Sequence, residues 1–371
     1  RDVAVTGVQT CALPISRLRT AARSWDRPCR CCGKPYSPPL PARLSQIKLT
    51  SSWPREGANK VSNRLVIALG GNALLRRGDR PDIAAQRANL AAAMPTLAAA
   101  VGGNEAVITH GNGPQIGLLA LQAAALSDVA MPAFDVLGAE SEGLIGYMIE
   151  QELRNALPER NVATLLTQVV VDADDPAFDA PNKPIGPVYD EATARRLARD
   201  RGWTVARDGP AWRRVVASPE PRCIVEIAAI RCLLDAGFAV VCVGGGGIPV
   251  SREPSGALRG VDAVIDKDLA AAHLAIELGA ARLLMLTDVG AIYDDWGSER
   301  PWAIRATNPT ALRARRFAPG SMGPKVEAAC RFAERGGIAM VGALTEAVAI
   351  LAGDAGTRIA IGTPEVVRSS T

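Results

Sequence analysis

Histidine and aromatic residues are scarce in this chain of 371 residues, which has two histidines, His110 and His273, and an aromatic fraction of 4%. No apolar run reaches the roughly 18 to 20 residues of a membrane-spanning helix, since Thr345 and Glu346 interrupt the longest candidate. The P-loop pattern and the GxGxxG dinucleotide fingerprint are both missing. We therefore expect a soluble protein that uses neither of the two commonest nucleotide-binding folds.

The positive charge is confined to the first part of the chain. Residues 1–60 hold eleven Lys or Arg against three acids, so the other 311 residues carry a net charge of −4 although the whole chain carries +4. The body shows no basic run interleaved with aromatic residues, which argues against nucleic-acid binding. Residues 1–60 also lack a hydrophobic period, and we predict a spurious or disordered leader there.

Cysteine falls into two groups. Those of the leader have no Cys/His pair at zinc-finger spacing, so no metal site is expected among them. The other four lie among apolar neighbours, and we predict that they are buried, reduced thiols of a cytoplasmic protein. These four are Cys223, Cys232, Cys242 and Cys330.

From residue 64 onward, short apolar runs alternate with amphipathic helical patterns, which predicts an α/β fold with a largely parallel central sheet covered on both faces. One helix is predicted over about Asp82 to Val101. The runs predicted as strands are residues 65–69, 106–109, 162–171, 239–243, 282–287 and 338–341. Residues 172–221 break this rhythm with proline and arginine, yet they hold Trp203 and Trp212, so we predict an inserted lid subdomain rather than a linker.

Three glycine-rich loops follow predicted strands. They contain Gly70, Gly71 and Asn72, then Gly111 and Asn112, then Gly244 and Gly245. Glycine lets the backbone approach a phosphate closely, and the carboxyl ends of parallel strands meet at one edge of the sheet. Any one of these loops alone is better explained by a tight turn, but three of them together favour a phosphate-binding crevice. We expect His110 to orient its loop rather than to act as a base.

Lysine is rare after residue 60, where Lys183, Lys267 and Lys325 are the three that remain. In a chain rich in arginine, retained lysines suggest positions where a compact charge is needed. Lys267 precedes Asp268 at the start of a predicted helix, and Lys325 lies where a glycine-rich loop meets another. The alternative is a solvated surface lysine, and for Lys183 alone the two interpretations are equally balanced.

Together these segments resemble the carbamate kinase family, which has the amino acid kinase fold, over residues 64–362. The Asn182–Pro187 string favours this family over acetylglutamate, aspartate and uridylate kinases. The strings that carry the resemblance are Ala68–Leu75, Thr109–Gln115, Asn182–Pro187, Ser218–Pro221, Gly244–Pro249, Val264–Asp268, Leu286–Val289 and Phe317–Lys325.

The resemblance implies a three-layer αβα sandwich, a homodimer and a Mg²⁺ requirement with ATP or ADP. It also implies a carbamate and carbamoyl-phosphate lobe over 61–225, with the lid at about 172–221, and a nucleotide lobe over 226–371. Catalysis would rest on Lys183, Lys267, Asp268 and Lys325, and the glycine loops would hold the phosphoryl group and the carbamate. The nucleotide would be bound by Asp288, Tyr293 and Met322.

The implied reaction moves a phosphoryl group between ATP and carbamate, in arginine or other carbamoyl-phosphate-yielding catabolism. Carbamate is an anion and needs no general base, which suits a chain with two histidines. The alternatives are another small-acid kinase of this fold and a non-catalytic protein that binds carbamoyl phosphate or nucleotide. One segment departs from the family pattern: Gly138–Gly143 carries two acids, Glu140 and Glu142, where the family has less charge, which leaves the dimer face or a local partner at this segment open.

Overall fold

The structure is a computed structural model, and it describes residues 63–71, 74–75, 82–125, 132–296, 301–317 and 322–368. The expected leader and Asn72 lie outside these residues. Among the described residues, no helix combines the length and hydropathy that crossing a membrane requires.

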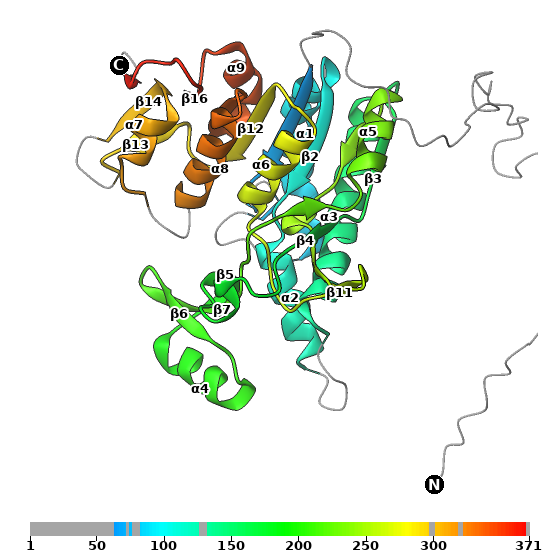
Figure 1. Cartoon of the computed structure of the whole chain (residues 1–371), viewed down its shortest axis with the longest axis vertical. Coiled ribbons are helices and arrows are strands. Elements are labelled where there is room, and N and C mark those ends of the chain that lie inside the picture. The colour runs from blue at the N-terminus through cyan, green and yellow to red at the C-terminus, as the bar shows by residue number, and fades with distance from the viewer. Residues whose placement is uncertain are drawn as a thin grey trace, which may run out of the picture. The chain divides into compact units, whose positions relative to one another are not determined.

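The main sheet has ten strands (Figure 1). Six neighbouring strands, in the order β15-β12-β1-β2-β9-β3, are all parallel to one another. Strand β16 pairs with β15 in the antiparallel sense and continues the sheet through β14, which carries β13 and β17. The strands are β1 (Arg64–Leu69), β2 (Glu105–His110), β3 (Val162–Thr164), β9 (Ala239–Val241), β12 (Arg282–Thr287), β13 (Ile292–Asp294), β14 (Trp302–Thr307), β15 (Ile338–Ala343), β16 (Thr357–Ile359) and β17 (Val366–Arg368).

Helices cover both faces of this sheet, as the two cores on either side of β1 demonstrate. Leu65 and Ile67 pack with residues of α1, α3 and α9, whereas Val66 and Ala68 pack with residues of α5, α6 and α8. A strand that buries both faces needs apolar residues without alternation, which is what the sequence of β1 has. The predicted α/β class with a largely parallel sheet is therefore confirmed. The helices are α1 (Ile83–Gly102), α2 (Gly113–Ala123), α3 (Phe134–Ala156), α4 (Glu191–Arg201), α5 (Ile227–Asp235), α6 (Lys267–Glu277), α7 (Pro309–Arg313), α8 (Met322–Glu334) and α9 (Ala347–Ala352).

A side-chain cap sets the start of α1 close to the predicted residue. The Asp82 side chain accepts a hydrogen bond from the backbone N–H of Ala85 at 2.8 Å and so caps α1.

The predicted single strand over 162–171 was wrong. It is two short strands in different sheets, because the chain leaves the main sheet after Thr164 and re-enters a second sheet at Gln168.

The second sheet has four strands in the order β11-β10-β4-β8. Its parallel pair is β10 with β4, and the two outer strands are antiparallel to their neighbours. Strand β9, which follows the expected lobe boundary at 225/226, pairs with β2 and β3, which precede it. The second-sheet strands are β4 (Gln168–Val170), β8 (Cys223–Ile224), β10 (Ile248–Arg252) and β11 (Leu258–Gly260).

Part of the segment predicted as an insert forms a sheet of its own (Figure 1). Strands β5 (Lys183–Tyr189), β7 (Ala211–Val216) and β6 (Val205–Asp208) are antiparallel, and α4 connects β5 to β6. The φ of Gly186 is +67°, and a Cβ on Gly117 of α2 would lie 2.0 Å from the Cα of Gly186. Two glycines are therefore required where β5 crosses α2.

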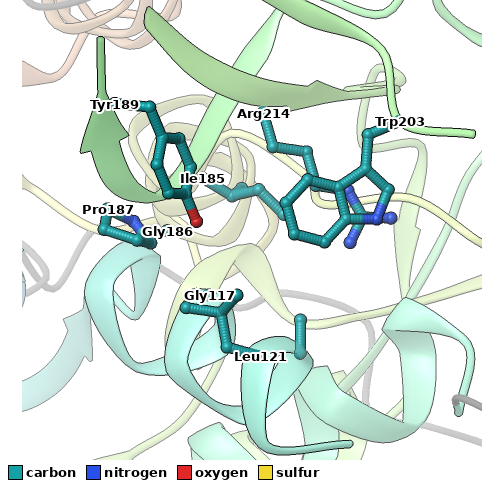
Figure 2. A pocket seen from close by; sticks show the side chains of 9 residues that line it. Gly117, Leu121, Ile185, Gly186, Pro187, Tyr189, Trp203 and Arg214 are labelled. Atoms are coloured by element: carbon teal, nitrogen blue, oxygen red, sulfur yellow. The ribbon is translucent and has the colours of Figure 1, made fainter. Parts of the chain in front are cut away.

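A small hollow lies beside this crossing. Figure 2 shows Tyr189, Trp203 and Arg214 extending from the small sheet and its flanking segments toward Gly117 and Leu121 of α2. The Arg214 guanidinium lies 4.6 Å from the Trp203 ring centroid and 4.8 Å from that of Phe134, so cation–π contacts join the small sheet to α3. The lining of the hollow includes none of the three lysines considered below.

Candidate active site

Three glycine loops leave the carboxyl ends of neighbouring parallel strands, as predicted. Gly70 and Gly71 follow β1, Gly111 follows β2, and Gly244 begins a short 3₁₀ turn soon after β9. The Gly111 N–H donates to the Leu69 carbonyl oxygen at 3.1 Å, which holds the first two loops together. The predicted clustering of Gly70, Gly71 and Gly111 at one edge of the sheet agrees with this geometry.

The three lysines found after residue 60 converge on two carboxylates. Lys267 Nζ donates to Asp268 Oδ1 at 2.6 Å, and Lys325 Nζ donates to Asp268 Oδ2 at 2.9 Å. Lys183, which begins β5 of the small sheet, pairs with the carboxylate of Asp266. Asp266 also caps α6, because its Oδ1 accepts from the N–H of Asp268 at 2.9 Å. Three ammonium groups and two carboxylates therefore meet at the positive end of the α6 dipole.

Burial changes the protonation behaviour of this cluster. It lowers the pKa of Lys267 to about 8, although Asp268 favours the charged form of that lysine. Burial alone would raise the pKa of Asp268, but Lys267 and Lys325 outweigh it and hold that pKa below its usual range. For Lys325 the attraction of Asp268 outweighs burial and raises the pKa. Asp268 therefore stays ionised and keeps two ammonium groups side by side.

The glycines allow the loops and the lysines to approach one another closely. A Cβ on Gly111 would lie 3.2 Å from both Cδ and Cε of Lys267, so this lysine lies across the β2 loop. A Cβ on Gly245 would lie 2.1 Å from Nδ2 of Asn112, which donates to Ser141 Oγ at 2.9 Å. The structure thus brings the second and third glycine loops into contact through Asn112.

His110 is fully buried at the end of β2 and is packed against the third loop. A Cβ on Gly244 would lie 2.3 Å from His110 Nε2. Burial lowers the pKa of His110 to about 4, so the imidazole is neutral at physiological pH. A neutral ring held in van der Waals contact with a loop fits the predicted orienting role.

The residues predicted to bind nucleotide lie on neighbouring segments beyond β12. Asp288 follows that strand, Tyr293 lies in β13, and Met322 begins α8, the helix that also carries Lys325. Tyr293 stacks obliquely on Trp296, with 5.3 Å between ring centroids. The role of these three residues in nucleotide binding stays a prediction.

Comparison with known proteins decides the family. The model of the amino acid kinase family matches residues 63–341. A carbamate kinase of Haemophilus influenzae is 53% identical over 298 residues, which span 80% of this chain and 96% of the relative. The chain belongs to the carbamate kinase family.

Solved structures of this family agree with that assignment. A carbamate kinase from Giardia lamblia bound to citric acid superimposes with a TM-score of 0.76 at 40% identity, covering 81% of this chain and 99% of that one. The Giardia lamblia carbamate kinase bound to AMP-PNP gives 0.73 at 39% identity, with coverages of 81% and 99%. The resemblance to carbamate kinases stated from the sequence is confirmed.

Two carboxylates at this carbamate kinase site escaped the sequence analysis. Asp266 lies in the Val264–Asp268 string, and it caps α6 and pairs with Lys183. Glu142 stands out in the sequence as a charge at odds with the family pattern, and it is buried and accepts from the N–H groups of Gly244 and Thr167. Its spacing from Gly138, Ile145 and Ile149 on the buried face of α3 was the available signal. Glu140 is exposed.

The prediction that all four cysteines of the body are buried was wrong for two of them. Cys242 and Cys330 are buried, whereas Cys223 and Cys232 are exposed. In α5 the apolar residues Ile230 and Leu234 face the core, and Cys232 falls on the opposite side of the helix.

Proposed function

We propose that this chain catalyses reversible phosphoryl transfer between ATP and carbamate, producing ADP and carbamoyl phosphate. The observation that carries the proposal is the meeting of Lys183, Lys267 and Lys325 around Asp266 and Asp268, at the edge of the sheet where three glycine loops lie. Phosphoryl transfer needs positive groups placed around the equatorial oxygens of the moving phosphoryl group, with little covalent work by the protein.

The lysines have separate parts in this mechanism. Lys267 and Lys325 neutralise the charge that develops between the nucleotide and carbamate, and Asp268 holds their ammonium groups in place. Lys183 reaches from the lid to the carbamoyl-phosphate end. Carbamate attacks as an anion, so no general base is required. His110 is buried and neutral, which agrees with a mechanism in which it transfers no proton.

The remaining predicted residues complete the two substrate sites. The phosphoryl group and carbamate are held by the three glycine loops, through Gly70, Gly71, Asn72, Gly111, Asn112, Gly244 and Gly245. Asp288, Tyr293 and Met322 contact the nucleotide. This division corresponds to a three-layer sandwich with a carbamoyl-phosphate lobe over 61–225, a lid at about 172–221 and a nucleotide lobe over 226–371. Since ATP and ADP are substrates, a cytoplasmic location is part of the proposal.

Magnesium enters this proposal as part of the nucleotide substrate. Among the described residues, no three or more His, Cys, Asp or Glu side chains gather as a metal site would require. Asp266 and Asp268 are already paired with lysines. A Mg²⁺ ion held mainly by the nucleotide phosphates and water fits such a site, because this ion commonly keeps several waters.

A homodimer is the further part of the proposal, with α3 at its interface. Val136 and Tyr147 are each about half exposed and lie on one face of this helix, together with Gly143. A Cβ on Gly143 would lie 3.7 Å from the exposed side chain of Leu166. An exposed apolar patch around a glycine is suited to a contact between the same faces of two protomers. Sedimentation of the wild type and of Tyr147→Asp tests this, and a wild-type monomer contradicts it.

The test of the reaction is a substrate panel with the purified chain. One assay couples ATP formation from ADP to hexokinase, with carbamoyl phosphate as donor. A second assay follows ADP formation from ATP, with N-acetylglutamate, aspartate or UMP as acceptor. We expect turnover with carbamoyl phosphate alone. Turnover with another acceptor would replace the proposed substrate, and binding of carbamoyl phosphate without turnover would favour a non-catalytic protein. A place in arginine or other carbamoyl-phosphate-yielding catabolism depends on the first outcome.

A further inference from the structure

Glu142 is a buried acid that the proposed mechanism does not use. Among the described residues three acidic side chains are nearly inaccessible to solvent, and the other two are Asp266 and Asp268 of the lysine cluster. Glu142 is 1% exposed, in the middle of α3. An acid is rarely buried without partners, so its hydrogen bonds indicate what it does.

Both carboxyl oxygens of Glu142 accept hydrogen bonds from backbone N–H groups of different segments. Oε1 accepts from Gly244 at 2.8 Å and Oε2 accepts from Thr167 at 3.1 Å. The Thr167 hydroxyl in turn accepts from the N–H of Val243 at 3.1 Å, and the Thr167 carbonyl oxygen accepts from the N–H of Ile248 at 2.8 Å. Glu142 and Thr167 therefore hold both ends of the Gly244–Gly247 loop.

This loop has an unfavourable backbone that needs such support. Val243 has φ 54° and ψ 34°, a left-handed conformation that a β-branched residue rarely adopts, and Gly245, Gly246 and Gly247 all have positive φ. Strain of this kind persists only where surrounding contacts determine the conformation. The N–H groups of Val243 and Gly244, at the strained point, are the ones bound by Thr167 and Glu142.

The loop lies between the two halves of the candidate active site. On one side Gly245 packs against the side chain of Asn112, and Ser141, the neighbour of Glu142, accepts a hydrogen bond from that side chain. On the other side a Cβ on Gly246 would lie 2.5 Å from the carbonyl oxygen of Ile265, the residue before Asp266. Movement of the loop would therefore displace both Asn112 and the start of α6.

We propose that Glu142 is a positioning residue for phosphoryl transfer, which fixes the Gly244–Gly247 loop between Asn112 and the lysine-bearing start of α6. The inference rests on the proposed function for its kinetic consequence. Burial raises the pKa of Glu142 to about 8, although the N–H groups of Thr167 and Gly244 favour its charged form, so most of the group is protonated at neutral pH. Its two oxygens accept from these N–H groups.

The decisive variant is Glu142→Gln, with Glu159→Gln as the matched control at an exposed acid in the turn after the same helix. An amide has one acceptor oxygen, so its NH₂ group must face a backbone N–H at either Gly244 or Thr167. We expect kcat/KM for carbamoyl phosphate to fall on the order of 10- to 100-fold, while the Kd of ADP changes by less than about 3-fold. We expect Glu159→Gln to match the wild type in both.

Hydrogen exchange gives a readout that does not depend on activity. Amides of residues 243–248 should exchange at least about 10-fold faster in Glu142→Gln than in Glu159→Gln, with slow exchange preserved in β1 and β12. Thr167→Val should act in the same direction, and the double variant should lose less than the sum of the single losses, because both side chains hold one loop.

The outcomes separate this inference from the proposed function. If the wild type shows no transfer between ADP and carbamoyl phosphate, the proposed function fails, while hydrogen exchange still decides whether Glu142 holds the loop. Unchanged exchange at 243–248 overturns the positioning role. Faster exchange with kcat/KM unchanged also overturns it, because the loop position would then be irrelevant to transfer. Equal losses for carbamoyl phosphate and ADP overturn it as well, since they indicate general unfolding.

Discussion

Asp268→Asn is the substitution that probes the lysine cluster most sharply. It keeps the size of the side chain and the helical position but replaces one oxygen with an NH₂ group. Each oxygen of Asp268 binds one ammonium group, at 2.6 Å to Lys267 and 2.9 Å to Lys325. The amide must therefore turn a donor toward one lysine, and both lysines lose the counter-charge to which they are hydrogen-bonded.

The size of the effect follows from burial. Asp268 is 4% exposed, and breaking a buried ion pair by removing one partner costs about 3–5 kcal/mol. The ammonium groups would separate, so we expect kcat to fall on the order of 10²- to 10³-fold, as for loss of a preorganised charge donor. Without Asp268 the pKa of Lys267 should fall further below its present value of about 8. Because Lys267 acts in its charged form, the residual activity should then shift toward lower pH.

The assay is ATP formation from ADP and carbamoyl phosphate across pH 6 to 9, with a thermal melt of each protein. Asp190→Asn is the matched control, since Asp190 caps α4 and asparagine caps helices equally well. This control should keep wild-type turnover. An Asp268→Asn variant with turnover within about 2-fold of the wild type, or with an unshifted pH profile, would refute the role assigned to Asp268.

Other perturbations address the lid, the loops and the buried acid. Lys183→Ala should raise KM for carbamoyl phosphate more than KM for ADP and should lower kcat, because lid closure would be incomplete; equal KM values to the wild type would remove the lid assignment. Gly111→Ala should lower kcat by displacing Lys267, whereas Gly113→Ala, where a Cβ meets nothing within 4 Å, should have a much smaller effect. The free energy of unfolding should fall as the pH rises from 4.5, the ordinary pKa of a glutamate, toward about 8, the pKa of Glu142 in the folded protein, because the buried site disfavours the ionised form. The stability advantage of the wild type over Glu142→Gln, measured by urea unfolding, should therefore shrink by roughly 2–4 kcal/mol from pH 5 to pH 8, and a constant difference would contradict this.

The sequence predicted the fold well where local patterns decide it. Apolar runs such as 65–69 and 282–287 became the central strands β1 and β12, because a strand buried on both faces has no polar alternation. The run 162–171 failed because hydrophobicity does not show that a strand ends at Thr164 and that a new one joins another sheet at Gln168. Such a change of sheet depends on partners distant in sequence.

The sequence identified individual residues of the candidate site but not their arrangement in space. The scarcity of lysine identified Lys183, Lys267 and Lys325, yet two of their ion pairs join distant residues: Lys183 is 83 residues from Asp266, and Lys325 is 57 residues from Asp268. Glu142 was recognised as a departure, and its position on the buried face of α3 contained the signal for burial. Its partner Gly244 lies 102 residues away, so the hydrogen bond itself was beyond sequence reasoning.

The most direct measurement compares the wild type with Lys325→Ala in ATP formation from ADP and carbamoyl phosphate, with the Kd of ADP measured by calorimetry on both proteins. The account predicts turnover by the wild type, a loss on the order of 10²- to 10³-fold in kcat for Lys325→Ala, and little change in ADP affinity. Near wild-type turnover by Lys325→Ala, or a parallel collapse of ADP binding, would contradict the claim that the converging lysines stabilise the transferring phosphoryl group.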